Sequence, residues 1–158
     1  MPGAVRVGVP AVLERTQRLP LSPQEAFQFF AEARNLEAIT PPWLHFEVVT
    51  PAPISMGAGT LIRYRLRLHG LRVGWLTEIR DWEPGLHFRD VQLSGPYALW
   101  DHTHTFEPDG KGGTIIGDRV LYEIGFGPLG QLAKRAFVRR DVERIFNYRA
   151  REIARWLG

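Results

Sequence analysis

Hydrophobic residues recur at every second position through the middle of the chain. Between 60 and 69, Ile62, Tyr64, Leu66 and Leu68 share one face, and polar residues alternate with them on the other. Such alternation predicts a strand with one buried face. The same pattern, with its turn residues, predicts seven strands: 11–19, 43–50, 60–69, 73–83, 86–94, 97–107 and 113–124. Short turns rich in Gly, Pro and Asp separate the later strands, which predicts antiparallel neighbours.

An early segment follows a helical period instead. Ser22 to Glu25 is typical of a helix start, because Ser22 can cap, a proline suits the first turn and Glu25 lies three residues after the cap. Residues 26–39 predict two short helices that break near Asn35. The Pro41–Pro42 pair stops any helix there.

The end of the chain predicts one long helix. Residues 131–157 contain neither Gly nor Pro, and residues 126–130 form a turn before them. At 1.5 Å per residue this helix spans about 40 Å, which is long enough to cross a whole sheet. Its apolar residues recur at helical spacing. They are Val138, Val142, Ile145, Phe146, Ile153 and Trp156.

The order of these elements predicts an α+β domain. We expect a curved antiparallel seven-stranded sheet with two short helices and one long C-terminal helix laid across it. A strongly bent sheet cannot pack flush against a straight helix along its whole length, so we expect an internal cavity between them. Residues 11–158 would form this single domain, and residues 1–10 a loose N-terminal arm.

Polar residues share the predicted inner face of the sheet with large apolar ones. Arg149 joins them from the helix, because it lies four residues after Ile145 and four before Ile153. Each buried polar group costs on the order of 1–3 kcal/mol unless it is hydrogen-bonded. A buried guanidinium needs a carboxylate, and both predicted inner-face aspartates are candidates. The inner-face polar residues of the strands are Asp90, Gln92, His102, His104 and Asp118.

His102 and His104 place two imidazoles on one strand face, about 7 Å apart. This spacing suits two ligands of one zinc ion, with Asp90 or Asp118 as a third. It also suits a hydrogen-bonded core pair, contact with a ligand, or acid–base chemistry. We favour the hydrogen-bonded pair, assign no metal and no cofactor, and keep His102, His104 and Asp90 as candidate catalytic residues.

The residues expected to line the cavity and contact a ligand combine these polar groups with aromatic ones. The aromatic residues can stack on a flat ligand, although core packing alone also explains them. The full set is Tyr64, Trp75, Phe88, Asp90, Gln92, Tyr97, Trp100, His102, His104, Asp118, Tyr122 and Arg149.

Composition narrows the classes of protein. The chain has 158 residues, 44% of them hydrophobic and 23% charged, which excludes disorder. It has no cysteine, which excludes disulfides, thiolate chemistry and thiol-ligated zinc or iron–sulfur sites. No apolar run reaches the roughly 18 residues of a membrane-spanning helix, and the start lacks the apolar core of a secretory signal. The default expectation is a cytoplasmic protein.

The positive charge lies at the end of the chain. Residues 128–158 hold 8 basic and 3 acidic residues, whereas residues 1–127 hold 12 and 14. No basic stripe with interleaved aromatics and no nucleic-acid motif is present, so we expect no nucleic-acid binding. A solvated helix face is the simplest interpretation. Contact of this helix with anionic lipid or an acidic partner stays open, as does the oligomeric state.

The order of elements and three segments, 27–48, 95–130 and 144–149, resemble the START and polyketide cyclase-like (SRPBCC) superfamily, in its bacterial cyclase/dehydrase-like branch. The resemblance runs from about residue 11 to residue 157. It implies the helix-grip fold and an internal apolar cavity roofed by the long helix. The superfamily includes lipid carriers, hormone and allergen-type binders and polyketide cyclases. No catalytic residue is invariant across it, so the resemblance transfers only the position of the cavity.

Three functions follow from these observations. The first is binding or transport of a hydrophobic or aromatic small molecule, lipid or polyketide-like, in the internal cavity. The alternative is a cyclase or dehydratase that uses His/Asp acid–base chemistry on a polyketide-like substrate. The third is an interaction role in which the basic helix or an open sheet edge recruits a partner or a membrane surface.

Overall fold

The computed structural model describes residues 9–124 and 128–158, the last segment with side chains from residue 135. Seven strands form one antiparallel sheet in the order β1-β7-β6-β5-β4-β3-β2. The strands are β1 (Ala11–Leu19), β2 (Glu47–Val48), β3 (Leu61–Leu68), β4 (Leu71–Glu83), β5 (His87–Ser94), β6 (Leu99–Pro108) and β7 (Thr114–Glu123). The helices are α1 (Pro23–Ala31), α2 (Asn35–Ile39), the 3-10 helix η1 (Pro42–Leu44) and α3 (Pro128–Leu157).

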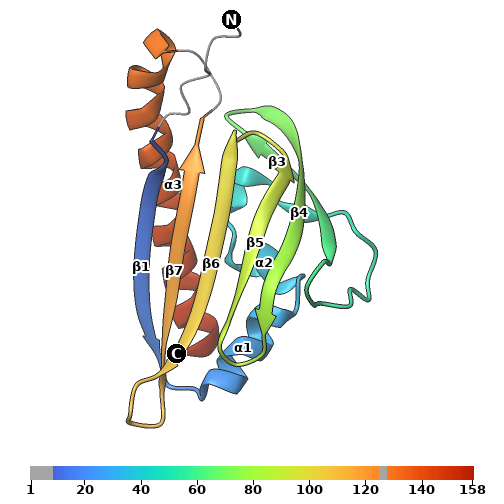
Figure 1. The fold of residues 1–158 in the computed structure, drawn as a ribbon, viewed down its shortest axis with the longest axis vertical. Coiled ribbons are helices and arrows are strands. Elements are labelled where there is room, and N and C mark those ends of the chain that lie inside the picture. Colours follow the sequence, from blue (N-terminus) through green and yellow to red (C-terminus); the bar gives the residue numbers. More distant parts are fainter. Residues whose placement is uncertain (1–8, 125–127) are drawn as a thin grey trace, which may run out of the picture.

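The sheet is curved, and the helices lie together on one side of it, with α3 running along β1 and β7 (Figure 1). This confirms the predicted α+β architecture, a helix-grip arrangement of a bent sheet and a long helix. Within the described residues, no helix is long and apolar enough to cross a membrane. The predicted arm falls almost entirely on residues 1–8, outside the described residues, and β1 begins at Ala11 as expected.

Local chemistry explains where the elements begin and turn. The Ser22 side chain caps α1 by accepting a hydrogen bond from the Glu25 backbone N–H at 3.2 Å, and proline occupies the first turn. The β3–β4 hairpin turns on His69 and Gly70, both with positive φ, at 49° and 81°. Two consecutive residues with positive φ form the tight hairpin turn whose twist matches the flanking strands.

Two predicted boundaries are wrong. The strand expected over 43–50 is only the two residues of β2, because Pro41 and Pro42 start a 3-10 turn in which Leu44 donates to the Pro41 carbonyl at 3.1 Å. The long helix begins at Pro128 rather than at 131, since proline is tolerated in a first helical turn. The remaining expected turn residues, 126 and 127, lie outside the described residues.

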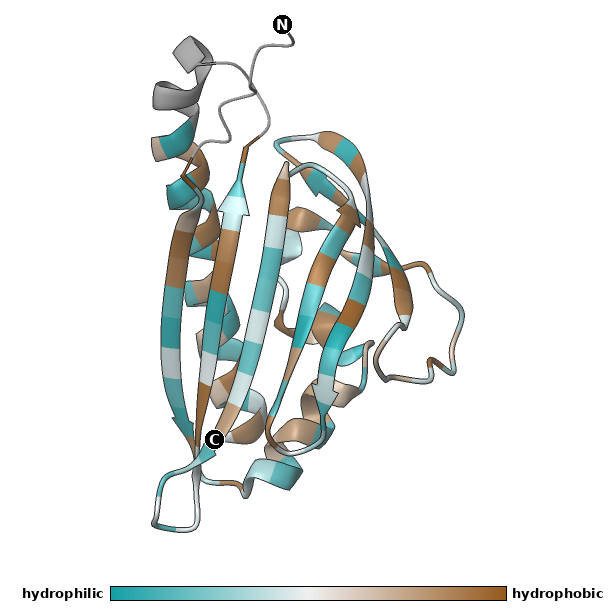
Figure 2. Cartoon of the chain, viewed as in Figure 1, coloured by the Kyte–Doolittle hydropathy of each residue, from teal (hydrophilic) through white to brown (hydrophobic). Residues whose placement is uncertain are grey.

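The alternation of burial along the strands follows the sequence pattern, visible as alternating brown and teal bands in Figure 2. The buried side chains form two clusters. One lies under α1 and α2, where Phe27 packs edge-on against Phe106 at 5.1 Å. The other lies under α3 and joins Val142 and Phe146 to Trp100. The cavity described below lies where the two clusters meet.

The apolar stripe of α3 faces the sheet as predicted, except at its end. Val142, Phe146 and Ile153 are buried, and Arg149 is buried among them. Trp156 is 58% exposed, contrary to the prediction. Trp156 lies two heptads after Val142. Because a straight helix drifts about 20° per heptad, Trp156 is rotated about 40° away from the apolar stripe. Leu157 packs against the core in place of Trp156.

Candidate ligand-binding site

A cavity that is partly open to solvent lies between the curved sheet and the helices and has two lobes. The larger lobe is about 120 Å³, and its lining is mainly apolar. The smaller lobe is about 40 Å³ and lies beneath α1 and α2, against Phe30 and Phe88. The two lobes are neighbours, because they share a wall of lining residues. That wall consists of Leu36, Ile39, Tyr64, Asp90, His104 and Arg149.

The structure brings most of the expected ligand-binding residues to this cavity. Those bordering it are Tyr64, Trp75, Phe88, Asp90, Tyr97, Trp100, His102, His104 and Arg149. Three others do not border it. The Gln92 amide bonds the backbone of Tyr97 at 2.7 and 3.1 Å and so closes the β5–β6 turn. Tyr122 packs under α3 and borders a separate surface groove. Asp118 lies on β7, where its carboxylate contacts His102.

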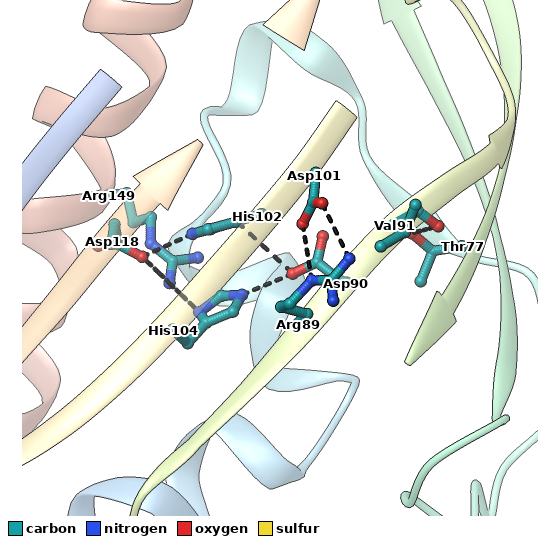
Figure 3. Close-up of polar contacts among 9 residues, drawn as sticks. All are labelled: Thr77, Arg89, Asp90, Val91, Asp101, His102, His104, Asp118 and Arg149. Carbon is teal, nitrogen blue, oxygen red and sulfur yellow. Dashed lines mark hydrogen bonds and ion pairs between the residues drawn. The ribbon is translucent and has the colours of Figure 1, made fainter. Parts of the chain in front are cut away.

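A polar network of five side chains lies at the shared wall, and three of them, Asp90, His104 and Arg149, are part of that wall (Figure 3). His104 Nε2 donates to Asp90 Oδ2 at 2.5 Å, and His102 Nε2 donates to Asp118 Oδ1 at 2.7 Å. Arg149 Nη2 lies 3.3 Å from the same Asp118 oxygen and 3.5 Å from His104 Nδ1. The buried guanidinium therefore pairs with Asp118, which settles the choice that the sequence leaves open.

The two imidazoles are stacked face to face, with ring centroids 3.7 Å apart. Phe88 continues the stack on the far side of His104 at 4.1 Å. This packing fixes both ring orientations, so each Nε2 points at its own aspartate. The predicted sharing of one inner face by the two histidines is confirmed, since they are 4% and 5% exposed.

Burial and neighbouring charges set the protonation of the network. Burial alone would raise the pKa of Asp118, but the Arg149 guanidinium and the bond from His102 outweigh it and hold that pKa well below its ordinary value. Burial would also raise the pKa of Asp90, but the interaction with His102 and the hydrogen bond from His104 lower its pKa overall. For His104, burial first and then the charge of His102 lower the pKa to about 4.

At neutral pH, then, both carboxylates are ionised and His104 is neutral. Its proton sits on Nε2, facing Asp90, which leaves Nδ1 as an acceptor for the Arg149 guanidinium. Within the described residues, Trp75 Nε1 and Arg149 Nε are buried donors without a partner. Both atoms are enclosed by protein.

Solved structures share this architecture over nearly the whole chain. TTHA0849 from Thermus thermophilus is 22% identical with a TM-score of 0.69, over 92% of this chain and 95% of its own. The Zhui aromatase/cyclase of Streptomyces sp. R1128 is 14% identical with a TM-score of 0.73, over 92% of each chain. A START superfamily protein of Mycobacterium smegmatis is 11% identical with a TM-score of 0.62, over 92% of this chain and 98% of its own. The chain has the START/polyketide cyclase-like fold.

By sequence, no protein-family model and no curated protein matches the chain. The START/polyketide cyclase-like fold therefore rests on the structure, at low sequence identity. This fold agrees with the expected position of the cavity, between the sheet and the long helix. It identifies neither a ligand nor a reaction.

Three potential metal ligands, Asp90, His102 and His104, have atoms within 4.8 Å of one another. A metal lies in the plane of each imidazole that binds it, about 2.0–2.1 Å from the nitrogen. The two ring planes are stacked 3.7 Å apart at only 28°, so one ion cannot lie in both. Binding would require one ring to turn and break its bond to an aspartate. This arrangement fits a hydrogen-bonded network better than a metal centre.

Sequence reasoning missed the contribution of the short helices α1, α2 and η1 to the cavity. Leu36, Ile39 and Thr40 from α2 and its end, and Leu44 from η1, border the larger lobe. Phe29 and Phe30 from α1 border the smaller lobe. These residues lie in helices too short to show a clear apolar stripe. The signal that could have been used is the density of large apolar side chains in residues 27–46, far more than two short surface helices need.

Proposed function

We propose that this protein binds or carries a small hydrophobic or aromatic molecule in the cavity between the sheet and α3. The observation that carries the proposal is the larger lobe, about 120 Å³ of mainly apolar space with an ionised polar network on its wall. Affinity would come from apolar burial, at about 25 cal/mol per Å², and the polar wall would orient the ligand.

The volume favours an aromatic ligand over a lipid. A dry apolar cavity of about 150 Å³ accommodates a benzene-sized molecule. The two lobes here, of about 120 and 40 Å³, have the capacity for one aromatic ring with a short substituent. Aromatic side chains also surround the larger lobe, where Trp75 and Trp100 pack edge to face at 5.3 Å. An acyl chain or a long polyketide would need the sheet and α3 to move apart.

Two measurements test the proposal. Native mass spectrometry of protein isolated from its own host without organic solvent should show a bound small organic molecule. Ligand-observed NMR should show that ethylbenzene, a probe of the right size, binds the purified protein. The absence of both the bound mass and ethylbenzene binding would overturn the proposal.

A matched pair of variants on one strand locates the binding. Leu68 borders the larger lobe, whereas Leu61 lies on the same strand with its side chain 49% exposed. Leu68→Phe fills part of the lobe and should abolish ethylbenzene binding. Leu61→Phe should leave binding unchanged. Equal binding by both variants would place the ethylbenzene outside the cavity and contradict the proposal.

The second candidate is a cyclase or dehydratase acting on a polyketide-like substrate. It is favoured by two buried histidine–carboxylate pairs, His104–Asp90 and His102–Asp118, beside the cavity. With a pKa of about 4, His104 would act as a general base rather than a general acid at neutral pH. Replacement of both histidines by glutamine should abolish turnover of a poly-β-carbonyl substrate while the protein stays folded. Turnover that survives the double replacement would refute this candidate.

A further inference from the structure

The Asp90 carboxylate on the polar wall of the cavity has an oxygen acceptor that no described residue satisfies. Asp90 uses Oδ2 for His104, at 2.5 Å, and the same atom lies 3.5 Å from His102 Nδ1. Its other oxygen, Oδ1, makes no hydrogen bond within residues 9–124 and 128–158, and is not among the enclosed, unpartnered atoms. The side chain is 20% exposed and borders both lobes, so Oδ1 is open to the cavity.

A hydroxyl donor lies on the same wall. Tyr64 is 7% exposed and borders both lobes, and its hydroxyl makes no hydrogen bond with a described residue. Burial and the nearby charge of Asp90 raise the pKa of Tyr64, so its hydroxyl stays protonated and can donate. The wall therefore offers an acceptor and a donor at the junction of the two lobes.

The charges of the network decide which ligand group suits that junction. Two ionised carboxylates face a single guanidinium, and Arg149 lies against Asp118 at 3.3 Å. The Arg149 guanidinium carries one positive charge and its Nε is enclosed by protein, so the two carboxylates leave the wall with an excess of negative charge. A carboxylate on the ligand would place a third negative charge beside a single guanidinium, which is unfavourable in a buried site.

We infer that the natural ligand is a one-ring hydroxylated aromatic, a phenol, whose hydroxyl donates to Asp90 Oδ1 and accepts from the Tyr64 hydroxyl. A neutral hydroxyl satisfies both wall groups at once, whereas an ammonium group has no lone pair for Tyr64 and an ether has no proton for Asp90. The ring occupies the larger lobe among its aromatic residues. This inference rests on the proposed binding function and names its ligand class.

The test compares four molecules of nearly one shape: 4-ethylphenol, 4-ethylanisole, ethylbenzene and 4-ethylbenzoate. Their affinities are measured by calorimetry or ligand-observed NMR. A hydrogen bond to a charged acceptor predicts that 4-ethylphenol binds about tenfold more tightly than ethylbenzene. 4-Ethylanisole should bind no better than ethylbenzene, and 4-ethylbenzoate should bind at least tenfold more weakly than 4-ethylphenol.

Asp90→Asn should remove the preference for 4-ethylphenol and change ethylbenzene affinity less than twofold. Asp101 provides the matched control. Its side chain is 21% exposed against 20% for Asp90, but it lies on the other face of the sheet, where Arg89 holds it at 2.9 Å. Asp101→Asn should leave all four affinities unchanged. If Asp90→Asn does not fold, Tyr64→Phe tests the same junction, with an expected loss of several-fold for 4-ethylphenol alone.

The outcomes separate this inference from the proposed function. Ethylbenzene binding with no preference for 4-ethylphenol, or a preference that survives Asp90→Asn and Tyr64→Phe, overturns the phenol assignment and leaves the binding function standing. Tightest binding by 4-ethylbenzoate overturns it as well, because the ligand would then pair with the Arg149 guanidinium. Failure of all four molecules to bind overturns both.

Discussion

The buried ion pair between Arg149 and Asp118 gives a prediction whose size follows from the structure. The side chains are 8% and 10% exposed, and Nη2 lies 3.3 Å from Oδ1. Arg149→Met keeps most of the apolar stem but leaves the Asp118 carboxylate buried with only His102 as a partner. Removing one partner of a buried pair costs about 3–5 kcal/mol. At about 2–4 °C per kcal/mol for a domain of this size, Tm should fall by about 10 °C.

Urea unfolding followed by circular dichroism measures this loss, with Arg155→Met on the same helix as the control. Arg155 is 77% exposed and lies 3.6 Å from Glu152. Loss of such a surface pair should change the free energy of unfolding by less than about 1 kcal/mol. The double variant Arg149→Met with Asp118→Asn should recover part of the lost free energy of unfolding, because the unpaired carboxylate charge of Asp118 is then removed.

Acid should narrow the gap between the wild type and Arg149→Met. In the wild type, the lowered pKa of Asp118 stabilises the fold at pH values above the ordinary pKa of an aspartate. This contribution is lost as the pH falls through the lowered pKa of the folded state. Without the guanidinium, the pKa of Asp118 rises and the variant loses little more on acidification. The reasoning is refuted if Arg149→Met is no less stable than Arg155→Met, or if Asp118→Asn recovers nothing.

Three further predictions concern the network, the β5–β6 turn and α3. His104 has a folded pKa of about 4 against an ordinary 6.5, so the unfolded chain gains a proton that the folded one does not. The free energy of unfolding should therefore decrease between about pH 6.5 and pH 4, by about 3 kcal/mol, and His104→Gln should flatten this slope. Gln92→Ala should cost about 1–2 kcal/mol in urea unfolding, by loss of the bonds to Tyr97, and leave ethylbenzene affinity unchanged. The solvent face of α3 should retain the protein on anionic vesicles at low salt and release it at high salt. The exposed arginines responsible are Arg135, Arg139, Arg140, Arg144, Arg151 and Arg155.

Each of these three predictions would be contradicted by a specific result. An acid slope unchanged in His104→Gln would show that other groups titrate in that range. Loss of ethylbenzene binding in Gln92→Ala would make that amide part of the cavity. Vesicle retention that persists at high salt, or after all six arginines are replaced by glutamine, would exclude the electrostatic contact. Retention on nucleic acid instead of vesicles would contradict the choice of partner.

The sequence alone predicted the strands, the faces and the buried arginine, because these depend on local periodicity. Side chains two apart share a strand face, so His102 and His104 point inward together wherever the strand lies. Arg149 joins Val142 and Ile153 because helical spacing places it in their stripe. The same rule is least accurate at element ends, as Trp156 and the short strand β2 show. There, helix drift and a proline-initiated turn override the local pattern.

Only the tertiary structure decided which groups meet across the cavity. Asp90 and Asp118 are equivalent candidates for Arg149 by pattern, and the choice depends on the register of β5, β6 and β7 against α3. The diversion of Gln92 to the Tyr97 backbone, and the helix residues on the cavity wall, likewise arise from contacts distant in sequence. The cavity volume, and with it the class of ligand, depends on sheet curvature and helix placement together. Both are set by the packing of the whole domain, and no single segment encodes them.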